Sequence, residues 1–396
     1  MLPFMVLTGA IVAAPMGQLP RPTGSHAVGT TVAYLVDSTR RETSYPSGRP
    51  IALQLWYPAG AGEGRVAPYL MEDGLDRLLL AQGYYGVDTA VISGWARLQT
   101  HARLDADPDT GRHPLITFSV GLGVIRANYT ALAEELASRG YVFALVESPG
   151  AGVFLLPDGR VIQDTTNALE EPAAHRAAVE AWSGDVSFVL DHLQRSRAGV
   201  AEAAVARTID WRRVSAAGHS SGGLVAVTTC EHDSRVRACI DLDGGTAAPT
   251  GEPIVNFLRT GVGRPTLILR SQPIYSDADF ARRGITREAW ERGGAGGRAA
   301  LDSLAARSRG ELWIGSVAGT GHFSFTDAPF LMPTTISRFG GRIIDAELGQ
   351  RVIAAAILAF LDRQLGARGE GLDAVARRFP ELTVRRVSPA PRASRS

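Results

Sequence analysis

Hydrophobic and polar positions along most of the chain follow two alternating patterns. Short apolar runs, typical of strands buried on both faces, recur at 115–121, 141–148, 214–217, 238–243, 265–271 and 311–317. Amphipathic stretches typical of helices lie between or after them, at 128–140, around 179–193, at 223–229 and at 352–365. This alternation predicts an α/β protein with a doubly wound, mostly parallel sheet and helices on both faces.

The N-terminal part has a different pattern. In residues 28–36 and 51–56, β-branched and aromatic residues alternate with smaller or polar ones, and the turn-rich stretch SYPSGRP separates the two runs. This predicts an antiparallel hairpin or meander. Residues 59–109 are Gly- and Pro-rich at first and then helical at 75–81. We interpret them as an insertion near the mouth of a site on the sheet.

The two ends of the chain differ from the single domain predicted for residues 19–382. Within residues 1–18, the apolar run Phe4 to Ala14 has the length of a signal-peptide core, although no positive charge precedes it. It favours export to a secreted or periplasmic location; a cytoplasmic protein with an apolar N-terminus lying on the domain is the alternative. Residues 383–396 are basic and rich in Pro and Ser, which predicts a disordered tail.

Composition excludes several classes of function. The 396 residues carry a net charge of +1, which does not favour nucleic acid or an acidic substrate as partner. All 41 basic residues are arginine, so a Walker A lysine, a Schiff-base lysine and a Ser-Lys dyad are excluded. The only two cysteines, Cys230 and Cys239, are too few for a disulfide scaffold or a metal cluster, and we expect two buried free thiols.

The most specific motif lies between the run at 214–217 and the helix at 223–229. It reads Gly218-His219-Ser220-Ser221-Gly222, the GxSxG pattern of a nucleophile elbow. Such a turn strains its serine and requires small neighbours, which the two glycines provide. Ser220 would then present its hydroxyl at a helix N-terminus. The alternative is a plain helix-capping turn, with Ser220 or Ser221 as the N-cap.

A serine hydroxyl becomes a good nucleophile only when a base takes its proton, and an acid must hold that base. In folds with this elbow the chain order is serine, acid, histidine. Only His232 and His322 follow Ser220. His232 lies at the far end of the elbow helix, whereas His322 lies in a Gly-rich loop directly after the last predicted strand. The sequence therefore predicts His322 as the base.

The acid is less clear from the residues alone. Asp241 and Asp243 end one predicted strand, and Asp277 and Asp279 follow the next. The end of either strand can carry the acid in such a sheet. Spacing does not choose between them.

From about residue 19 to 365 the chain resembles the platelet-activating factor acetylhydrolase family of α/β-hydrolases. The resemblance rests on LPRPTGSHAVG, LQLWYPA, FSVGLGVIRANYTALAEELASRGYVFALVESPG, GHSSGG, CIDLDGG and GTGHFSFTD. It implies the α/β-hydrolase fold, with Ser220 as nucleophile, Asp243 as acid and His322 as base. It also implies an oxyanion hole from the backbone N–H groups of Leu122 and Ser221. The chain departs from the family at Val120, where members usually carry histidine.

These features predict a serine hydrolase of carboxylic esters, and the resemblance implies short-chain acyl esters or the sn-2 acyl group of phospholipids. The alternatives are a polyester or general carboxylesterase and, from another class, a non-catalytic scaffold that binds a lipid or partner. No cofactor or metal is expected; Arg126 stands where a dinucleotide fingerprint needs its third glycine. The expected partner is a small ester or lipid, without nucleic acid or stable membrane insertion. The sequence leaves the oligomeric state open.

Overall fold

The computed structural model describes residues 17–42, 44–60, 64–162, 171–196, 201–245, 254–333, 335–336, 343–366 and 369–387. Within them, one sheet has the strand order β13-β12-β11-β10-β9-β5-β6-β2-β1-β4-β3. Its strands are β1 (Ala27–Asp37), β2 (Arg49–Ala59), β3 (Val66–Pro68), β4 (Gln99–Leu104), β5 (His113–Ser119), β6 (Val142–Glu147), β9 (Ile209–His219), β10 (Val236–Leu242), β11 (Thr266–Gln272), β12 (Leu312–Ala318) and β13 (Leu382–Val387). β7 (Phe154–Leu155) and β8 (Val161–Ile162) pair separately.

The central strands from β6 to β12 run parallel, as predicted. β2 joins this core antiparallel to β6, and β1 pairs antiparallel with β2 along its whole length, which confirms the predicted hairpin. Every residue of β5, β6 and β2 is buried. Apolar runs therefore mark β5 and β6, because helices cover both faces of the sheet.

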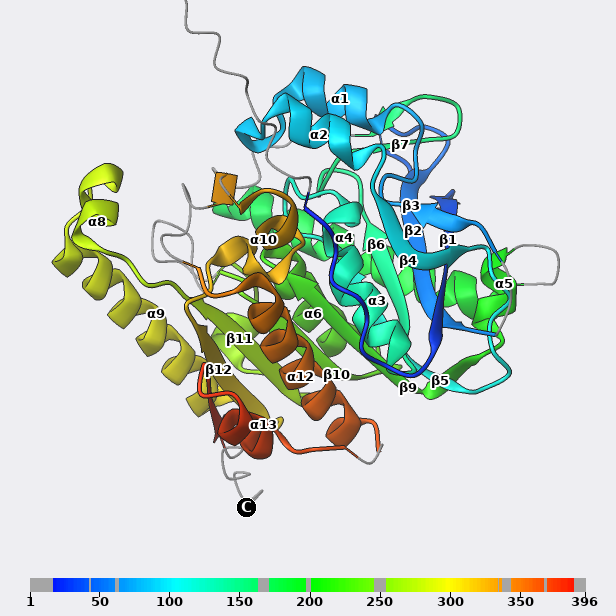
Figure 1. The fold of residues 1–396 in the computed structure, drawn as a ribbon. Coiled ribbons are helices and arrows are strands. Elements are labelled where there is room, and N and C mark those ends of the chain that lie inside the picture. The colour runs from blue at the N-terminus through cyan, green and yellow to red at the C-terminus, as the bar shows by residue number, and fades with distance from the viewer. Residues whose placement is uncertain are drawn as a thin grey trace, which may run out of the picture.

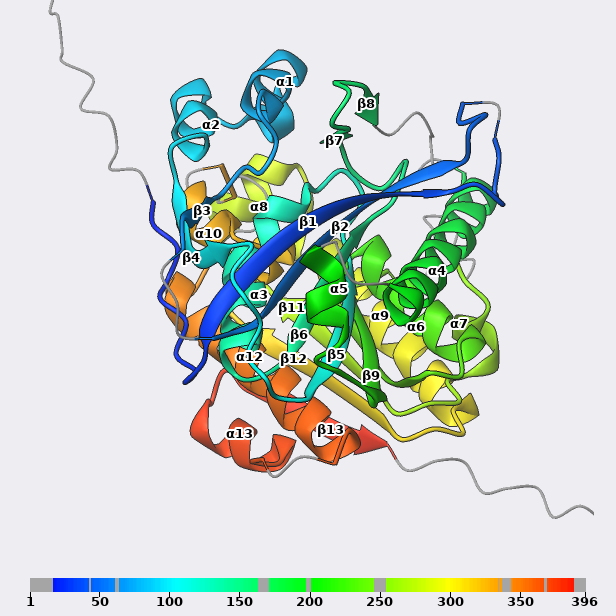
Figure 2. The same ribbon diagram turned by 90° about the vertical axis from the view of Figure 1, so that its right-hand side faces the viewer.

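Helices cover the sheet on both sides (Figures 1 and 2), as predicted. α3 and α12 pack on one face, and α4 and α6 pack on the other. The helices and helical turns are α1 (Leu75–Gln82), η1 (Tyr84–Gly86), α2 (Thr89–Trp95), η2 (Arg126–Tyr129), α3 (Thr130–Ser138), α4 (Pro172–Arg195), α5 (Ala201–Ala206), α6 (Ser221–His232), α7 (Phe257–Thr260), α8 (Asp277–Arg283), α9 (Arg287–Arg307), η3 (His322–Phe325), α10 (Ala328–Leu331), α12 (Ala346–Gln364) and α13 (Leu372–Arg378).

Segment 59–109 adds two edge strands to the sheet and a helical layer beside it. It contains β3, β4, α1, η1 and α2, and α1 and α2 stand at one end of the molecule (Figure 1). A second apolar cluster, centred on Leu79, Ile92 and Trp95, packs this layer against the start of α3 and against α10. The layer therefore lies over the region where the sheet meets the loop before α3.

Part of the predicted C-terminal tail is ordered. Residues 382–387 form β13, which pairs antiparallel with β12 along the sheet edge, so the prediction of disorder is wrong for residues 383–387. The unpaired backbone N–H and C=O groups of an edge strand can pair with another strand even when the side chains of that strand are mostly polar. Residues 388–396, and residues 1–16 with most of the predicted export signal, lie outside the described residues.

The two cysteines form a disulfide, so the prediction of free thiols is wrong. Cys230 lies in the last turn of α6 and Cys239 in β10, and their Cα atoms are 6.1 Å apart, a separation that a disulfide spans readily. Helix and strand meet there because α6 packs against β10. In the chain-entropy description, closing so short a loop stabilises the fold by about 3 kcal/mol.

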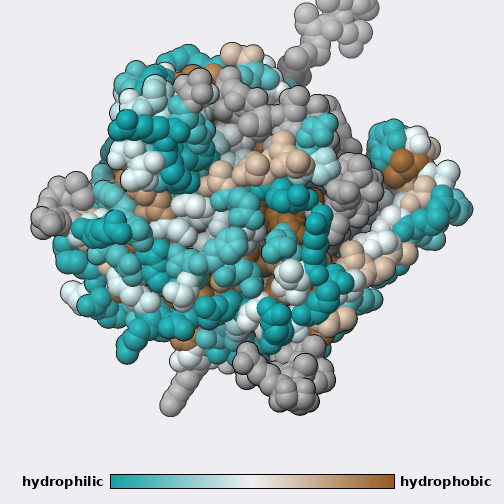
Figure 3. Space-filling view, turned by 180° about the vertical axis from the view of Figure 1, so that it is seen from behind, coloured by the Kyte–Doolittle hydropathy of each residue, from teal (hydrophilic) through white to brown (hydrophobic). Residues whose placement is uncertain are grey.

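None of the helices in the described part of the chain combines the length and apolar character needed to cross a bilayer. On the face seen from behind, hydrophilic side chains cover most of the described surface (Figure 3).

Candidate active site

Ser220 occupies a strained turn between β9 and α6. Its φ of 57° and ψ of −127° lie in a region that residues with a side chain rarely adopt. The turn is tight on both sides: a Cβ on Gly218 would overlap the carbonyl of Gly222, and one on Gly222 would overlap the carbonyl of Ser119. The strand, turn and helix expected of a nucleophile elbow are therefore present, and the two glycines are sterically required.

Asp243 and His322 are joined by a hydrogen bond of 2.8 Å from His322 Nδ1 to Asp243 Oδ2. Asp243 directly follows β10, and His322 opens η3 after β12, so both lie at the carboxyl ends of parallel strands beside the elbow. Because Nδ1 carries the proton in this bond, Nε2 of neutral His322 keeps a free lone pair. The pair can thus offer a base whose tautomer the carboxylate sets.

Further donors support the Asp243 carboxylate. Ser271 donates its backbone N–H to Oδ1 and its hydroxyl to Oδ2, each at 2.8 Å. Burial raises the pKa of Asp243, but the hydrogen bond and charge of His322, the charge of Arg270 and the Ser271 N–H outweigh it. They hold the pKa well below its usual range, so the group stays an anion.

The other candidate acids have different partners. Asp277 pairs with Arg287 on the surface, and Asp279 caps α8 through Ser276. Asp241 accepts the backbone N–H of Gly244 at 2.7 Å. Of the four aspartates that spacing left open, the structure pairs Asp243 with His322.

The loop after β5 runs against the elbow. A Cβ placed on Gly121 would lie 3.1 Å from Cβ of Ser220, so Leu122 follows at the edge of the turn. Ser221 is the first residue of α6, and its N–H therefore has no partner within the helix. The side chain of Val120, at the position where the resemblance led us to expect histidine, is buried in the main core. A tyrosine hydroxyl supports the loop instead: Gly121 N–H donates to Tyr129 at 2.9 Å.

The His322 loop is tied to the start of α3 as well as to Asp243. The carboxylate of Asp327 accepts the N–H groups of Thr130 and Ala131, each at 3.1 Å, and its own N–H donates to the carbonyl of Asn128. Burial raises the pKa of Asp327 to about 7, against the effect of these hydrogen bonds. The loop therefore has a buried anchor five residues after His322.

A buried cluster of charged side chains forms around Arg126, which follows the loop of Leu122 in the sequence. Arg126 pairs with Glu72 and, at 2.8 Å, with Glu147, and it also donates to Gln54. Burial raises the pKa of Glu147 to about 7, although the charge of Arg126 acts in the opposite direction. The arginine that breaks the dinucleotide fingerprint thus has a structural role under the loop of Leu122.

Sequence reasoning did not find several polar residues around Ser220, Asp243 and His322. Tyr85, with φ 47°, donates its hydroxyl to the Leu122 carbonyl at 3.3 Å, and its ring contacts Phe323. The ring of His175 lies 2.9 Å from the hydroxyl of Ser221. Tyr129 and His219 make a buried pair. Only His219 carried a sequence signal, a titratable residue inside the elbow motif; the others come from distant segments.

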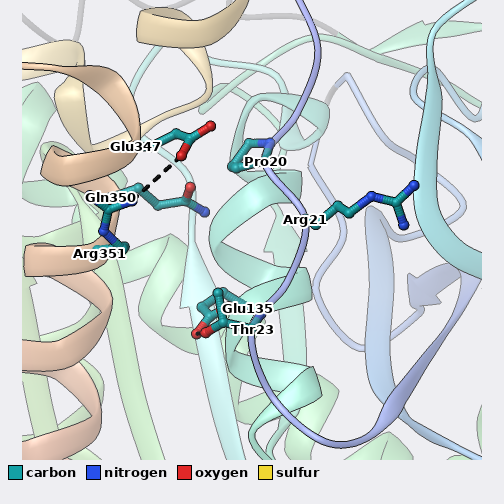
Figure 4. A pocket seen from close by; sticks show the side chains of 7 residues that line it. All are labelled: Pro20, Arg21, Thr23, Glu135, Glu347, Gln350 and Arg351. Carbon is teal, nitrogen blue, oxygen red and sulfur yellow. Dashed lines mark hydrogen bonds and ion pairs between the residues drawn. The ribbon is translucent and has the colours of Figure 1, made fainter.

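A hollow of about 300 Å³ lies away from these residues, between the N-terminal segment, α3 and α12 (Figure 4). It is lined by Pro20, Arg21, Thr23, Glu135, Glu347, Gln350 and Arg351. Among the described residues, no group of His, Cys, Asp and Glu side chains has the arrangement of a metal site.

His219 gives the fold an acid sensitivity that can be measured. Burial and the neighbouring His322 lower the pKa of His219 to about 3. An unfolded histidine has a pKa of about 6.5, so the unfolded chain binds a proton here first as the pH falls. The free energy of unfolding then drops by up to about 1.4 kcal/mol per pH unit between roughly pH 6.5 and 3, and the loss is absent above that window.

Other buried groups act with the opposite sign, so the expected result is a difference between two proteins. Burial raises the pKa values of Glu134, Glu147 and Asp327 to about 8, 7 and 7, which favours the fold at lower pH. Between pH 7.5 and 5, urea unfolding should show the wild type losing about 2 kcal/mol more than His219→Phe. Equal pH dependence of the two would mean that His219 titrates normally in the folded state.

Comparison with known proteins identifies relatives over most of the chain. The sequence pattern of the family described as "Platelet-activating factor acetylhydrolase, isoform II" matches residues 11–151 and 202–373. A platelet-activating factor acetylhydrolase of Cavia porcellus is 23% identical over 388 residues, covering 88% of this chain and 78% of the relative. A probable 1-alkyl-2-acetylglycerophosphocholine esterase of Arthroderma benhamiae is 22% identical, covering 57% of this chain and 59% of the relative.

A solved structure gives a similar result. The ferulic acid esterase of Streptomyces cinnamoneus superposes with a TM-score of 0.71 and 29% identity, covering 93% of this chain and 99% of that one. The similarity confirms the predicted α/β-hydrolase fold, and the named relatives are esterases and acetylhydrolases. The chain therefore belongs to the platelet-activating factor acetylhydrolase isoform II family and is a carboxylic ester hydrolase.

Proposed function

We propose that this esterase works through an acyl-enzyme formed on Ser220, with His322 as the base and Asp243 as the acid. The observation that carries the proposal is the 2.8 Å bond from His322 Nδ1 to Asp243, which leaves Nε2 free to accept a proton, together with the strained elbow that holds Ser220. A surface turn has no need for a serine at φ 57° between two sterically required glycines. The plain capping turn therefore explains less.

In the proposed reaction, Ser220 Oγ attacks the ester carbonyl while His322 Nε2 takes the hydroxyl proton. The carbonyl oxygen becomes an oxyanion, which accepts hydrogen bonds from the backbone N–H groups of Leu122 and Ser221. Collapse of this intermediate breaks the bond to the alcohol, and His322 returns its proton to the leaving oxygen. A water, deprotonated by His322, then attacks the acyl-enzyme, the bond from the acyl carbon to Ser220 Oγ breaks, and His322 returns the proton to Oγ as the carboxylic acid leaves. Throughout, the Asp243 anion stabilises the imidazolium.

For substrate, we propose esters of short acyl chains, including the sn-2 acyl group of phospholipids. The support is the names of the relatives, which are an acetylhydrolase and a 1-alkyl-2-acetylglycerophosphocholine esterase. A polyester or general carboxylesterase remains the alternative within the class, and the structural similarity to a ferulic acid esterase supports this alternative. A non-catalytic scaffold does not account for the paired Asp243 and His322.

We also propose that the protein works outside the reducing cytoplasm. The disulfide between Cys230 and Cys239 supports this, because such bonds persist mainly in secreted and periplasmic proteins.

A fluorophosphonate probe tests the mechanism directly, because it labels only an activated serine. We expect labelling of the wild type and of Ser303→Ala, which changes an exposed serine on α9, and no labelling of Ser220→Ala. p-Nitrophenyl esters from acetate to longer chains then rank acyl length, and kcat/KM should be highest for the short chains. A labelled Ser220→Ala, or an unlabelled wild type, would refute the assignment of Ser220.

A further inference from the structure

Three parts of the proposed active site are connected by one chain of buried hydrogen bonds. Gly121 N–H donates to the hydroxyl of Tyr129 at 2.9 Å, and that hydroxyl lies 3.0 Å from Nδ1 of His219. Nε2 of His219 lies 2.9 Å from the backbone carbonyl of His322. This series of hydrogen bonds thus connects the loop of Leu122, His219 next to Ser220, and the backbone of His322.

The donors and acceptors in this chain allow one arrangement of protons. A carbonyl oxygen can only accept, so Nε2 of His219 must carry the proton that goes to His322. A neutral imidazole then has a lone pair on Nδ1, and Tyr129 donates its single hydroxyl proton to it. The tyrosine oxygen in turn accepts from Gly121. Every group in this series of hydrogen bonds is satisfied, and the His322 carbonyl and the Tyr129 hydroxyl together fix the tautomer of His219.

The ring of His219 is also packed against the catalytic histidine. It is fully buried, its centroid lies 4.6 Å from that of His322, and it stacks on Phe325 at 5.9 Å. The charged groups facing it are His322 and Asp243. A second positive charge at this distance would oppose the imidazolium that His322 forms during the reaction. A neutral His219 avoids that cost, and its surroundings keep it neutral.

The same hydrogen bonds orient the loop of Leu122, which we call the oxyanion loop because it would supply one N–H group to the oxyanion. Gly121 is held on both sides, since its N–H donates to Tyr129 and its carbonyl accepts the N–H of Val124 at 3.0 Å. The carbonyl of Gly121 and the N–H of Leu122 belong to one planar trans peptide, so they point in opposite directions. Holding the carbonyl toward Val124 therefore sets the direction in which Leu122 presents its N–H.

We propose that Tyr129 and His219 are positioning residues that align the oxyanion loop and the His322 backbone with Ser220 as one unit. The inference rests on the proposed function, because it assigns a purpose to the pair only if Ser220, His322 and the Leu122 N–H act on substrate. Neither residue touches the reacting atoms. Their loss should slow the chemical steps and leave substrate binding nearly unchanged.

The test measures kcat and KM for p-nitrophenyl acetate with Tyr129→Phe, His219→Phe and the double variant. Tyr129→Phe keeps the ring but removes one hydroxyl, and we expect kcat to fall about 10-fold, the usual effect of one lost hydrogen bond. His219→Phe keeps a packed ring but removes both contacts, and kcat should fall roughly 100-fold. KM should change less than about 2-fold in each, because misalignment affects the transition state more than the ground state.

Tyr141→Phe is the matched control. It removes another buried tyrosine hydroxyl, which donates to Asp362 at 2.6 Å. Tyr141 directly precedes β6, at the amino end of the parallel strands and so away from the elbow, and its loss should cost similar stability without changing kcat. Urea unfolding of each variant shows whether lost activity tracks lost stability. The double variant should be no slower than His219→Phe, because the two residues act as one chain.

Ser220→Ala in the same series separates the two proposals. If Ser220→Ala retains activity, the proposed mechanism fails, and this inference fails with it. If Ser220→Ala is inactive while Tyr129→Phe and His219→Phe keep wild-type kcat, or change KM instead, the positioning role alone is refuted. Fully additive losses in the double variant would likewise contradict a single connected unit.

Discussion

Replacing Ser220 by alanine is expected to lower kcat by roughly 10⁵- to 10⁶-fold, the scale seen when a triad nucleophile is removed from a serine hydrolase. Without Oγ there is no acyl-enzyme, and His322 can only assist a direct attack by water. The oxyanion donors remain, so a residual rate above that of the uncatalysed reaction should persist. Steady-state hydrolysis of p-nitrophenyl acetate at high enzyme concentration measures both limits.

The same position should reveal the strain that the elbow stores. An alanine in place of Ser220 would keep the unfavourable φ of 57°, so Ser220→Ala should unfold at nearly the wild-type urea concentration. Ser220→Gly relieves the strain, since glycine adopts positive φ freely, and should be more stable than Ser220→Ala by about 1 kcal/mol. If Ser220→Ala were unfolded, its loss of activity would say nothing about the mechanism. Ser220→Gly also lacks the hydroxyl but should be more stable, so it serves as a second test. Activity within 10-fold of the wild type in either variant would contradict the nucleophile assignment.

Asp243→Asn is expected to lower kcat by about 10³- to 10⁴-fold, because it reverses the tautomer of His322. The backbone N–H of Ser271 donates to Oδ1 of Asp243 and can do nothing else, so the amide oxygen of an asparagine must take that place. Its NH₂ group then faces Nδ1 of His322. Nδ1 becomes an acceptor, the proton moves to Nε2, and the base can no longer accept the proton of Ser220.

Two controls make this expectation specific. Asp277→Asn alters a surface carboxylate paired with Arg287, and it should leave kcat unchanged. Ser271→Ala removes the hydroxyl donor to Asp243 but keeps the N–H, so its effect should stay within about 10-fold. An active Asp243→Asn variant, with activity lost in Asp277→Asn or Asp279→Asn, would move the acid to the end of β11.

The central strands could be predicted because helices bury both faces of the sheet, which demands apolar residues at every position. The periphery was harder. β13 contains Arg385 and Arg386 and alternates with exposed residues, so its composition suggests a tail; it forms a strand because β12 offers an unpaired edge. α9 contains Gly293, Gly294, Gly296 and Gly297, which weaken a helix, yet its far end is held by buried Leu301 and Leu304.

The disulfide shows the same limit. Nothing in the spacing of Cys230 and Cys239 says that a helix end and a strand will bring their Cα atoms within 6.1 Å. The sulfur atoms meet because α6 packs against β10, which is a tertiary contact.

For the site, the elbow and the proposed base could both be predicted from the residues. Gly218 and Gly222 are dictated by a local backbone shape, and chain order with elimination left His322. Spacing left four aspartates open and only the resemblance pointed to Asp243; the tertiary structure pairs Asp243 with His322 and joins Tyr129 to His219, 90 residues further along the chain. The physical reason is the distance along the sequence over which each interaction acts. The steric requirements of a turn act between neighbouring residues, so they can be recognised in the local sequence. A hydrogen bond between distant segments requires only that each carries a polar residue, and the packing of the fold decides which of these residues meet.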